Sequence, residues 1–229
     1  MKILALDTST EYCSIALSLD GNISSRSELA GQRHSELLIQ MLDEMLASAG
    51  IKLAQLDGIA FGTGPGSFTG VRIACGVAQG LALGAGLPVV GVCTLQALAQ
   101  AANHDNANHD KVIAVLDARM GEVYHAAYQK QAGQWITVCH PSLCLPLHAP
   151  PVEGSEWVGA GSGFAVHADV LANRYSAQLV GYDAQATPQA SAIAQLALPE
   201  FNAGRGEDAA QARPLYLRDK VALKTAERR

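Results

Sequence analysis

The stretch Gly62-Thr63-Gly64-Pro65-Gly66-Ser67-Phe68-Thr69-Gly70-Val71-Arg72 lies between an apolar run, residues 58–61, and a long apolar segment that begins at Ile73. This order is typical of a strand, a glycine-rich turn and the start of a helix, and it points backbone N–H groups at an anion. Ser67 is expected to cap the helix that begins at Phe68. The stretch therefore predicts an α/β fold with the frame of a nucleotide site.

The charged residues that a nucleotide-binding loop uses are missing from this stretch. A P-loop ends in Gly-Lys-Ser/Thr, and no lysine lies between Lys52 and Lys111. A dinucleotide fingerprint has an acidic residue about 20 positions further on, and none lies between Asp57 and Asp105. Ser67 does not fit the Gly-x-Ser-x-Gly elbow of a hydrolase. Peptidase activity at Ser67 is therefore the weakest of the functional alternatives.

The composition of the chain narrows its class. The 229 residues are 49% hydrophobic and 16% charged, with a net charge of −5, so the surface as a whole does not attract nucleic acid. The five cysteines are odd in number and form no C-x-x-C pair, which favours reduced thiols in a cytoplasmic protein without a metal site. Residues 1–7 run directly into a strand, so no signal peptide is expected.

One apolar segment, residues 73–93, has the length of a membrane span. Gly86 and Pro88 divide it into a helix and a following strand, so we expect a soluble helix and no membrane contact. Glycines that recur at every fourth position predict a helix packed closely through one face. These glycines are Gly76, Gly80 and Gly84.

Residues 35–49 predict a second helix, apolar on more than one side and closed by Gly50. Two neighbouring helices of these kinds are expected to dock against an equivalent pair on a partner. The alternative is that both helices bury their apolar residues against their own sheet. The residues expected at the partner interface are Leu37, Met41, Met45, Arg72, Gly76, Gly80 and Gly84.

A strand that ends in an aspartate occurs twice along the chain. The apolar strands ending in Asp7 and Asp117 are each followed by a turn and another strand. A polar, turn-rich stretch, residues 103–110, separates them and marks a boundary. The repetition predicts two lobes of similar design, an N-terminal lobe over residues 1–104 that carries the partner interface and a reduced C-terminal lobe over residues 105–229.

This layout resembles the actin-like (ASKHA, RNase H-like) fold of actin, sugar kinases and the Hsp70 ATPase, with two mixed-sheet lobes and flanking helices. Several motifs, in order along the chain, are more specifically similar to the TsaB (YeaZ) family of bacterial tRNA threonylcarbamoyladenosine biosynthesis proteins. The run over residues 64–72 is the most specific of them. The motifs are Ile3-Leu4-Ala5-Leu6-Asp7-Thr8-Ser9-Thr10, His34-Ser35-Glu36-Leu37-Leu38, residues 64–73, Asp117-Ala118-Arg119, Glu122-Val123-Tyr124, Gly161-Ser162-Gly163 and Pro214-Leu215-Tyr216-Leu217-Arg218.

The resemblance implies a non-catalytic scaffold subunit. The catalytic relative, TsaD, transfers threonylcarbamoyl to N6 of adenosine 37 in tRNAs reading ANN codons and holds its metal partly through a His-x-x-x-His pair. Thr94 and Leu98 stand at these positions here and cannot form a two-imidazole site. The implied partners are a TsaD-type catalytic subunit and a TsaE-type ATPase, with a homodimer in isolation. ATP or ADP and metal are expected in the partner subunits, and no cofactor on this chain alone.

The basic tail that begins at Arg213 is expected to contact tRNA only weakly or indirectly, since a solvated helix face is the preferred explanation of its charges. His34 is expected to be a local hydrogen-bonding group. Arg119 and Arg72 are each expected to pair with a carboxylate across the cleft between the lobes, or Arg72 to fix the glycine loop.

A vestigial nucleotide site is implied as well, because active members of the superfamily use the first aspartate to coordinate hydrated Mg²⁺. Its expected residues are Asp7, Thr8, Ser9, Asp117 and Gly161. The alternative function is an ATP-dependent kinase or ATPase of the same superfamily. A single aspartate at a strand end, however, is more often a turn former.

Overall fold

Two five-stranded sheets, each with the same order of strands, form the framework of the molecule. The computed structural model describes residues 1–102 and 109–218. The strands of the first sheet are β1 (Lys2–Asp7), β2 (Tyr12–Leu19), β3 (Asn22–Leu29), β4 (Gly58–Gly64) and β5 (Val89–Cys93). The strands of the second are β6 (Lys111–Asp117), β7 (Val123–Gln131), β8 (Gln134–Cys144), β9 (Trp157–Ala160) and β10 (Leu179–Asp183).

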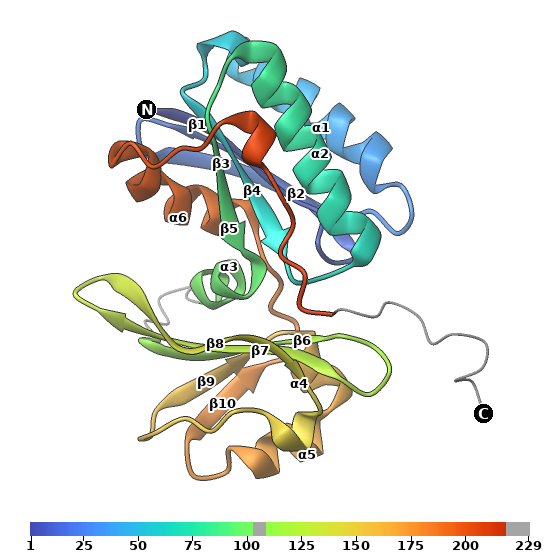
Figure 1. The fold of residues 1–229 in the computed structure, drawn as a ribbon, viewed down its shortest axis with the longest axis vertical. Coiled ribbons are helices and arrows are strands. Elements are labelled where there is room, and N and C mark those ends of the chain that lie inside the picture. Colours follow the sequence, from blue (N-terminus) through green and yellow to red (C-terminus); the bar gives the residue numbers. More distant parts are fainter. Residues whose placement is uncertain (103–108, 219–229) are drawn as a thin grey trace.

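The two sheets share one topology. The orders are β3-β2-β1-β4-β5 and β10-β9-β6-β7-β8 (Figure 1). In each sheet the first three strands pair antiparallel and the last two join in parallel, so β6 corresponds to β1 and β9 to β4. The predicted pair of lobes with a common design is therefore present.

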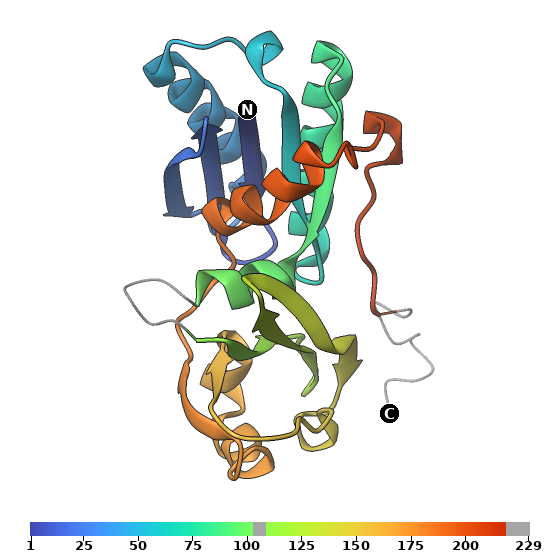
Figure 2. The same cartoon turned by 90° about the vertical axis from the view of Figure 1, so that its left-hand side faces the viewer.

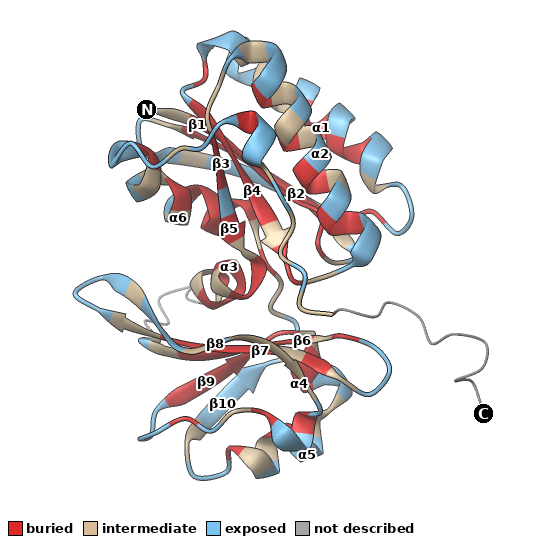
Figure 3. Ribbon diagram, in the orientation of Figure 1, coloured by how far each residue is buried: buried red, intermediate tan, exposed pale blue. Residues whose placement is uncertain are grey.

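The first sheet is covered by helices on both faces. Helices α1 (His34–Ala49) and α2 (Phe68–Ala85) pack on the side chains of Leu4 and Leu6, whereas α6 (Ala190–Asn202) packs on those of Ile3 and Ala5. Successive residues of a strand point to opposite faces, so a central strand with both faces buried is apolar throughout. Figure 3 shows the central strands β1 and β4 buried between these helices.

Helices α1 and α2 begin and end close to where the sequence predicts. Gly50 and Gly86 follow them in the left-handed conformation, with φ of 66° and 67°, which glycine adopts at little cost. The Ser67 side chain caps α2 by accepting a hydrogen bond from the N–H of Gly70 at 3.3 Å. In the described part of the chain α2 is the one helix long and apolar enough to cross a membrane, and it lies against the first sheet.

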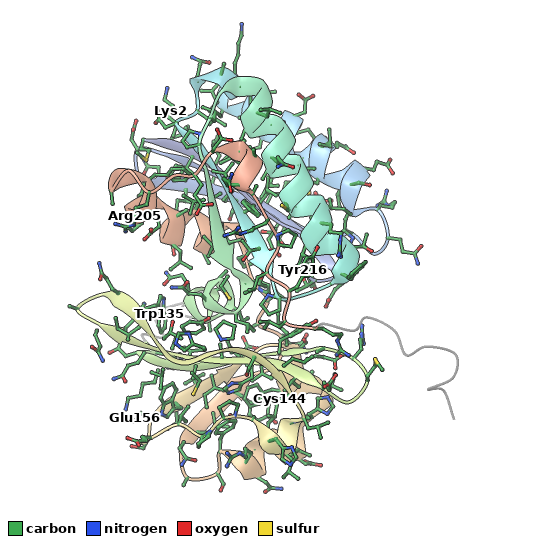
Figure 4. The ribbon with its side chains drawn as sticks, viewed as in Figure 1. Lys2, Trp135, Cys144, Glu156, Arg205 and Tyr216 are labelled. Carbon is green, nitrogen blue, oxygen red and sulfur yellow. The ribbon has the colours of Figure 1, made fainter. Side chains whose placement is uncertain are left out.

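A short helix, α3 (Thr94–Ala101), lies between the two sheets. Its Leu95 and Leu98 pack on the second sheet, while Gln100 donates a hydrogen bond to Gln195 of α6 at 2.6 Å and accepts one from Trp135 of β8 at 2.6 Å. Figure 4 shows Trp135 on the side of the second sheet that faces α3. The opposite face of that sheet carries α4 (Ser162–Val166) and α5 (Ala168–Arg174). Helix α3 therefore joins the lobes through contacts on both of its sides.

The chain returns to the first lobe after the second sheet is complete. The packing of α6 on the first sheet is followed by an antiparallel bridge between Val89 and Glu207, and by a short 3₁₀ turn, η3 (Ala209–Gln211), against α2 (Figure 2). The expected C-terminal lobe, residues 105–229, is therefore corrected in the structure: residues 190–212 complete the first lobe. Two further 3₁₀ turns are η1 (Leu53–Gln55) and η2 (Pro146–His148).

The tail from Asp219 onward, which holds four of the basic residues expected near tRNA, lies outside the described residues. The turn-rich boundary stretch is likewise described only from His109 on.

Candidate functional site

A cleft of about 690 Å³ opens between the two lobes. It lies where the turns after β1 and β6 face each other, beside the N-terminus of α2. Of the five residues expected at the vestigial nucleotide site, only Ser9 and Asp117 line it. The residues that line the cleft include Ser9, Thr10, His34, Ser67, Phe68, Asp117, Arg119, Met120, Ser162, Leu215, Tyr216 and Arg218.

The first aspartate, Asp7, is buried beneath the cleft and does not line it. Its Oδ1 accepts hydrogen bonds from the backbone N–H and the hydroxyl of Ser9, at 3.0 and 2.7 Å. Its Oδ2 lies against Gly62, where a Cβ atom would collide with the carboxylate, and no described residue donates a hydrogen bond to it. Burial raises the pKa of Asp7 from 3.8 to about 6. Asp7 is thus a turn former held in an environment that disfavours its charge.

The glycine-rich loop wraps around the turn that follows Asp7. A Cβ atom at Gly66 would collide with the carbonyl oxygen of Ser9, and one at Gly70 with that of Thr8. The Ser67 N–H donates to the Ser9 carbonyl at 2.7 Å, and the Thr8 hydroxyl donates to the Gly70 carbonyl at 2.7 Å. These glycines are therefore explained by the close approach of two backbone segments. The N–H of Ser67 is directed at this turn, although the sequence predicted it to face an anion.

His34 stabilises the same turn from the other side. Its Nε2 donates to the carbonyl oxygen of Thr10 at 2.8 Å, which confirms the prediction of a local hydrogen-bonding group.

The second aspartate, Asp117, forms an ion pair with an arginine of its own turn. The Arg119 guanidinium lies 3.1 Å from Asp117 Oδ2, and the Arg119 N–H donates to Oδ1 at 3.2 Å. His167 Nε2 lies 3.7 Å from Oδ1, and the backbone N–H of Asp117 donates to the hydroxyl of Ser162 at 3.1 Å. Arg119 was expected to pair across the cleft; it pairs instead within the second lobe. The carboxylate of Asp117 is thus beside a guanidinium.

Gly161 serves packing as well. Its φ is +107°, and a Cβ atom there would lie against the Val115 carbonyl and the Leu98 side chain. The next residue, Ser162, lines the cleft in its place.

Thr94 and Leu98, where the resemblance to TsaD led us to look for histidines, have structural roles here. The Thr94 hydroxyl accepts a hydrogen bond from the N–H of Gly64 at 3.0 Å, and both Thr94 and Leu98 are fully buried. Within residues 1–102 and 109–218, no group of three or more His, Cys, Asp or Glu side chains is arranged to hold a metal ion.

Arg72 stacks between two aromatic rings. Its guanidinium carbon lies 3.4 Å from the ring centre of Phe68 and 4.7 Å from that of Tyr216, and its Nη1 donates to the Phe68 carbonyl at 2.7 Å. Cations placed over aromatic faces in this way are stabilised by the ring quadrupole. Of the two roles expected for Arg72, fixing the glycine loop is the one that the structure supports, through the Phe68 carbonyl; the described contacts include no carboxylate across the cleft.

The expected partner-interface residues divide into two groups. Leu37 and Met41 pack in the core between α1 and the first sheet, with exposed fractions of 8% and 1%, so in this structure they are not available to a partner. Met45 is half-buried. This correction has a simple reason, since the apolar stripe of α1 faces β2 and leaves the outer side of the helix largely polar.

The outer side of α2, in contrast, is open. Five residues at four-residue spacing are all exposed there, and a Cβ atom at any of the three helical glycines among them would meet nothing within 4 Å. The row also carries a single charge, that of an arginine. We call these residues the α2 row: Phe68, Arg72, Gly76, Gly80 and Gly84.

The sequence predicted no role at the cleft for residues 213–218, the first part of the basic tail, which we call the strap. Leu215, Tyr216 and Arg218 of the strap all line the cleft. Their only signal in the sequence was that they form one of the motifs that carried the family resemblance.

Solved structures resemble this chain over almost its whole length. A YeaZ structure from Pseudomonas aeruginosa superimposes with a TM-score of 0.84 at 40% sequence identity, covering 94% of this chain and 99% of that one. A second structure, of an uncharacterized protein described as similar to the peptidase YEAZ and also from P. aeruginosa, gives a TM-score of 0.85 at 40% identity. Together with the two duplicated sheets and the cleft between them, they define a bilobal protein of the actin-like, RNase H-like class.

Sequence comparisons then narrow the class. The tRNA threonylcarbamoyladenosine biosynthesis protein TsaB of Escherichia coli (strain K12) is 40% identical over 98% of this chain and 97% of its own length. The protein of the same name from Haemophilus influenzae is 38% identical over 98% and 96%. A sequence model of the TsaD family, described as tRNA N6-adenosine threonylcarbamoyltransferase, matches residues 22–225. The chain belongs to the TsaB (YeaZ) family.

Proposed function

We propose that this chain is a non-catalytic scaffold subunit required for threonylcarbamoyl transfer to N6 of adenosine 37 in tRNAs that read ANN codons. It binds and supports a TsaD-type catalytic subunit and a TsaE-type ATPase, and forms a homodimer in isolation. ATP or ADP and metal belong to the partner subunits. The names of its relatives support the pathway, and the chemistry of the cleft supports the absence of catalysis.

The observation that carries the proposal is the state of the two aspartates. Asp7 does not line the cleft, because its carboxylate is directed at Gly62. Asp117 lines the cleft but already holds the Arg119 guanidinium at 3.1 Å. A carboxylate that binds a metal ion must present its oxygens to the cleft; Asp7 does not, and Asp117 has Arg119 and His167 beside its oxygens. The cleft therefore favours a pseudo-ATPase over the alternative, a kinase or ATPase of the same fold.

The α2 row is the surface on which the partner docks in this proposal. Gly76, Gly80 and Gly84 expose backbone on the outside of the molecule, so a helix of another chain can approach them closely. Contact through a row of small residues stabilises a complex chiefly by dispersion and by burial of the flanking apolar side chains. The homodimer and the complex with the catalytic subunit use the same row in this proposal.

The experiment that tests the function is reconstituted threonylcarbamoylation of tRNA from threonine, bicarbonate and ATP, with this chain present or omitted. We expect product only when the chain is present, and neither tRNA modification nor ATP hydrolysis by the chain alone. Product formation that is independent of the chain would refute the scaffold role. ATP turnover by the chain alone, abolished by Asp7→Ala, would support the ATPase instead.

A matched pair of variants tests the placement of the interface. Gly80→Leu adds a bulky side chain to the α2 row, whereas Gly181→Leu makes the same change at an exposed glycine of the second lobe with equally open surroundings. We expect Gly80→Leu to abolish co-elution with the catalytic subunit on gel filtration and Gly181→Leu to retain it. Co-elution of Gly80→Leu would exclude this surface.

A further inference from the structure

The strap crosses from the first lobe to the second over the cleft. Its first-lobe contact is a backbone hydrogen bond, in which the N–H of Leu215 donates to the carbonyl of Thr63 at 2.8 Å. The neighbouring Gly64 has a φ of +103°, and a Cβ atom there would lie 3.2 Å from the Leu215 carbonyl oxygen. The end of β4 is therefore shaped to receive the strap.

The other end of the strap holds the second lobe. The Arg218 guanidinium donates to the carbonyl of Ala118 at 2.9 Å, pairs with the carboxylate of Glu122 at 2.8 Å and lies 3.4 Å from the Met120 sulfur. Its side chain is only 15% exposed. All three partners belong to the turn that follows Asp117 and forms one wall of the cleft. Hydrogen bonds in which the donor or the acceptor is charged are stronger than neutral ones, so these contacts of Arg218 hold the strap firmly against the turn.

The middle of the strap contacts the α2 row. The ring of Tyr216 stacks on Arg72, which itself stacks on Phe68, and Figure 4 shows Tyr216 beside the end of α2 that is nearer the second lobe. Tyr216 and Phe68 remain about half-exposed. A molecule that docks on the α2 row therefore meets Arg72 and Tyr216 together.

From this geometry we propose that the strap couples the α2 row to the cleft. A partner that engages Arg72 displaces Tyr216, and the strap then releases Arg218 from the turn of residues 118–122. The lobes stay joined through α3. The second lobe, which carries the released turn, therefore moves about that helix, and the cleft widens. By linkage, whatever widens the cleft also strengthens docking on the α2 row. The coupling to a partner rests on the proposed function, whereas the mechanical connection from Arg72 to the second lobe does not.

Hydrogen exchange of the isolated chain, monitored by mass spectrometry at concentrations where light scattering shows a monomer, tests the connection. The turn of residues 118–122 reports on it through the hydrogen bonds from Ala118 N to Glu122 O and from Glu122 N to Arg119 O. We expect Arg218→Ala to accelerate exchange in this turn about tenfold, equivalent to about 1.4 kcal/mol.

The decisive variant is Arg72→Ala, because Arg72 stacks on the strap and lies on the other lobe. We expect this substitution to accelerate hydrogen exchange in the same turn. Exchange in β1 and β4 should stay at the wild-type rate, which would show that the fold is intact. The control, Arg213→Ala, removes an exposed arginine of the same strap and should leave the turn unchanged. If Arg72→Ala leaves exchange in the turn at the wild-type rate, the coupling is overturned, even if Arg218→Ala accelerates it.

Adding the catalytic partner separates this inference from the proposed function. Bound partner should accelerate exchange at residues 118–122 while protecting α2. Protection of α2 without acceleration of the turn would retain the interface and overturn the coupling. If the partner changes exchange in neither α2 nor the turn, while Arg72→Ala still accelerates exchange in the turn, the proposed interface is refuted and the mechanical connection is upheld.

Discussion

Replacing Asp7 by asparagine is expected to stabilise the protein at neutral pH. The carboxylate is fully buried, and one of its oxygens, Oδ2, faces Gly62 without a hydrogen bond from any described residue. Asparagine keeps the shape of the side chain and an oxygen that can accept from Ser9, but it carries no charge. The comparison therefore isolates the effect of burying the negative charge.

The magnitude follows from the pKa of Asp7, which burial raises from 3.8 to about 6. A difference of this size corresponds to about 3 kcal/mol between the protonated and charged forms. Because the unfolded chain loses its proton at a lower pH than the folded protein, the stabilisation from the protonated carboxyl is complete below about pH 4. It is lost as the pH rises through about 6, the folded pKa.

Urea unfolding followed by circular dichroism, at about pH 4 and about pH 7.5, measures this effect. We expect Asp7→Asn to be more stable than wild type at the higher pH, with a difference in the free energy of unfolding that is roughly 2–3 kcal/mol larger there than at the lower pH. The control, Asp43→Asn, makes the same substitution at an exposed carboxylate of α1, so the comparison isolates the effect of burial. Equal differences for Asp7→Asn at both pH values would refute the reasoning, because the buried charge would then cost nothing.

Three further substitutions test the fold. At concentrations at which the chain is monomeric, Gly80→Leu should raise the free energy of unfolding by roughly 0.5–1 kcal/mol, since helical glycine is unfavourable and open space surrounds it. A loss of stability in thermal unfolding of the monomer would contradict that. Gly70→Ala should lower it by roughly 1–3 kcal/mol, because the new Cβ collides with the Thr8 carbonyl; wild-type stability in urea would show that the loop relaxes freely. Tyr175→Phe removes the hydroxyl 2.8 Å from buried His125 Nε2 and should cost roughly 1–3 kcal/mol per unpaired group; an unchanged urea midpoint would show that the bond contributes nothing.

Local features of the fold were predictable from the sequence because they depend on neighbouring residues. Gly50 as a helix end and Ser67 as a helix cap are both confirmed, since each is fixed by the backbone of its own helix. The two strands that end in aspartate also identified the duplicated lobes. The return of α6 to the first sheet was not predictable. Its apolar residues show that a face is buried, but periodicity carries no information about which sheet buries it.

The site was less predictable than the fold, for a related reason. Spacing places Asp7 at the end of a strand, but only the contact with Gly62 shows that its carboxylate is directed away from the cleft. The glycine loop has the composition of an anion site, yet its close approach to Thr8 and Ser9 is a long-range contact. Leu37 and Met41 show the same limit, because an apolar stripe fits a core and an interface equally well.

The placement of α6 has a consequence for how this protein is made. The five strands of the first sheet are complete at Cys93, but the helix that covers their second face begins at Ala190. A ribosome adding about 5–20 residues per second needs roughly 5–20 s to synthesise the chain in between. During that interval the apolar face formed by Ile3, Ala5 and Ala60 lacks the cover of α6. The first lobe therefore cannot complete its core until synthesis has passed the second lobe.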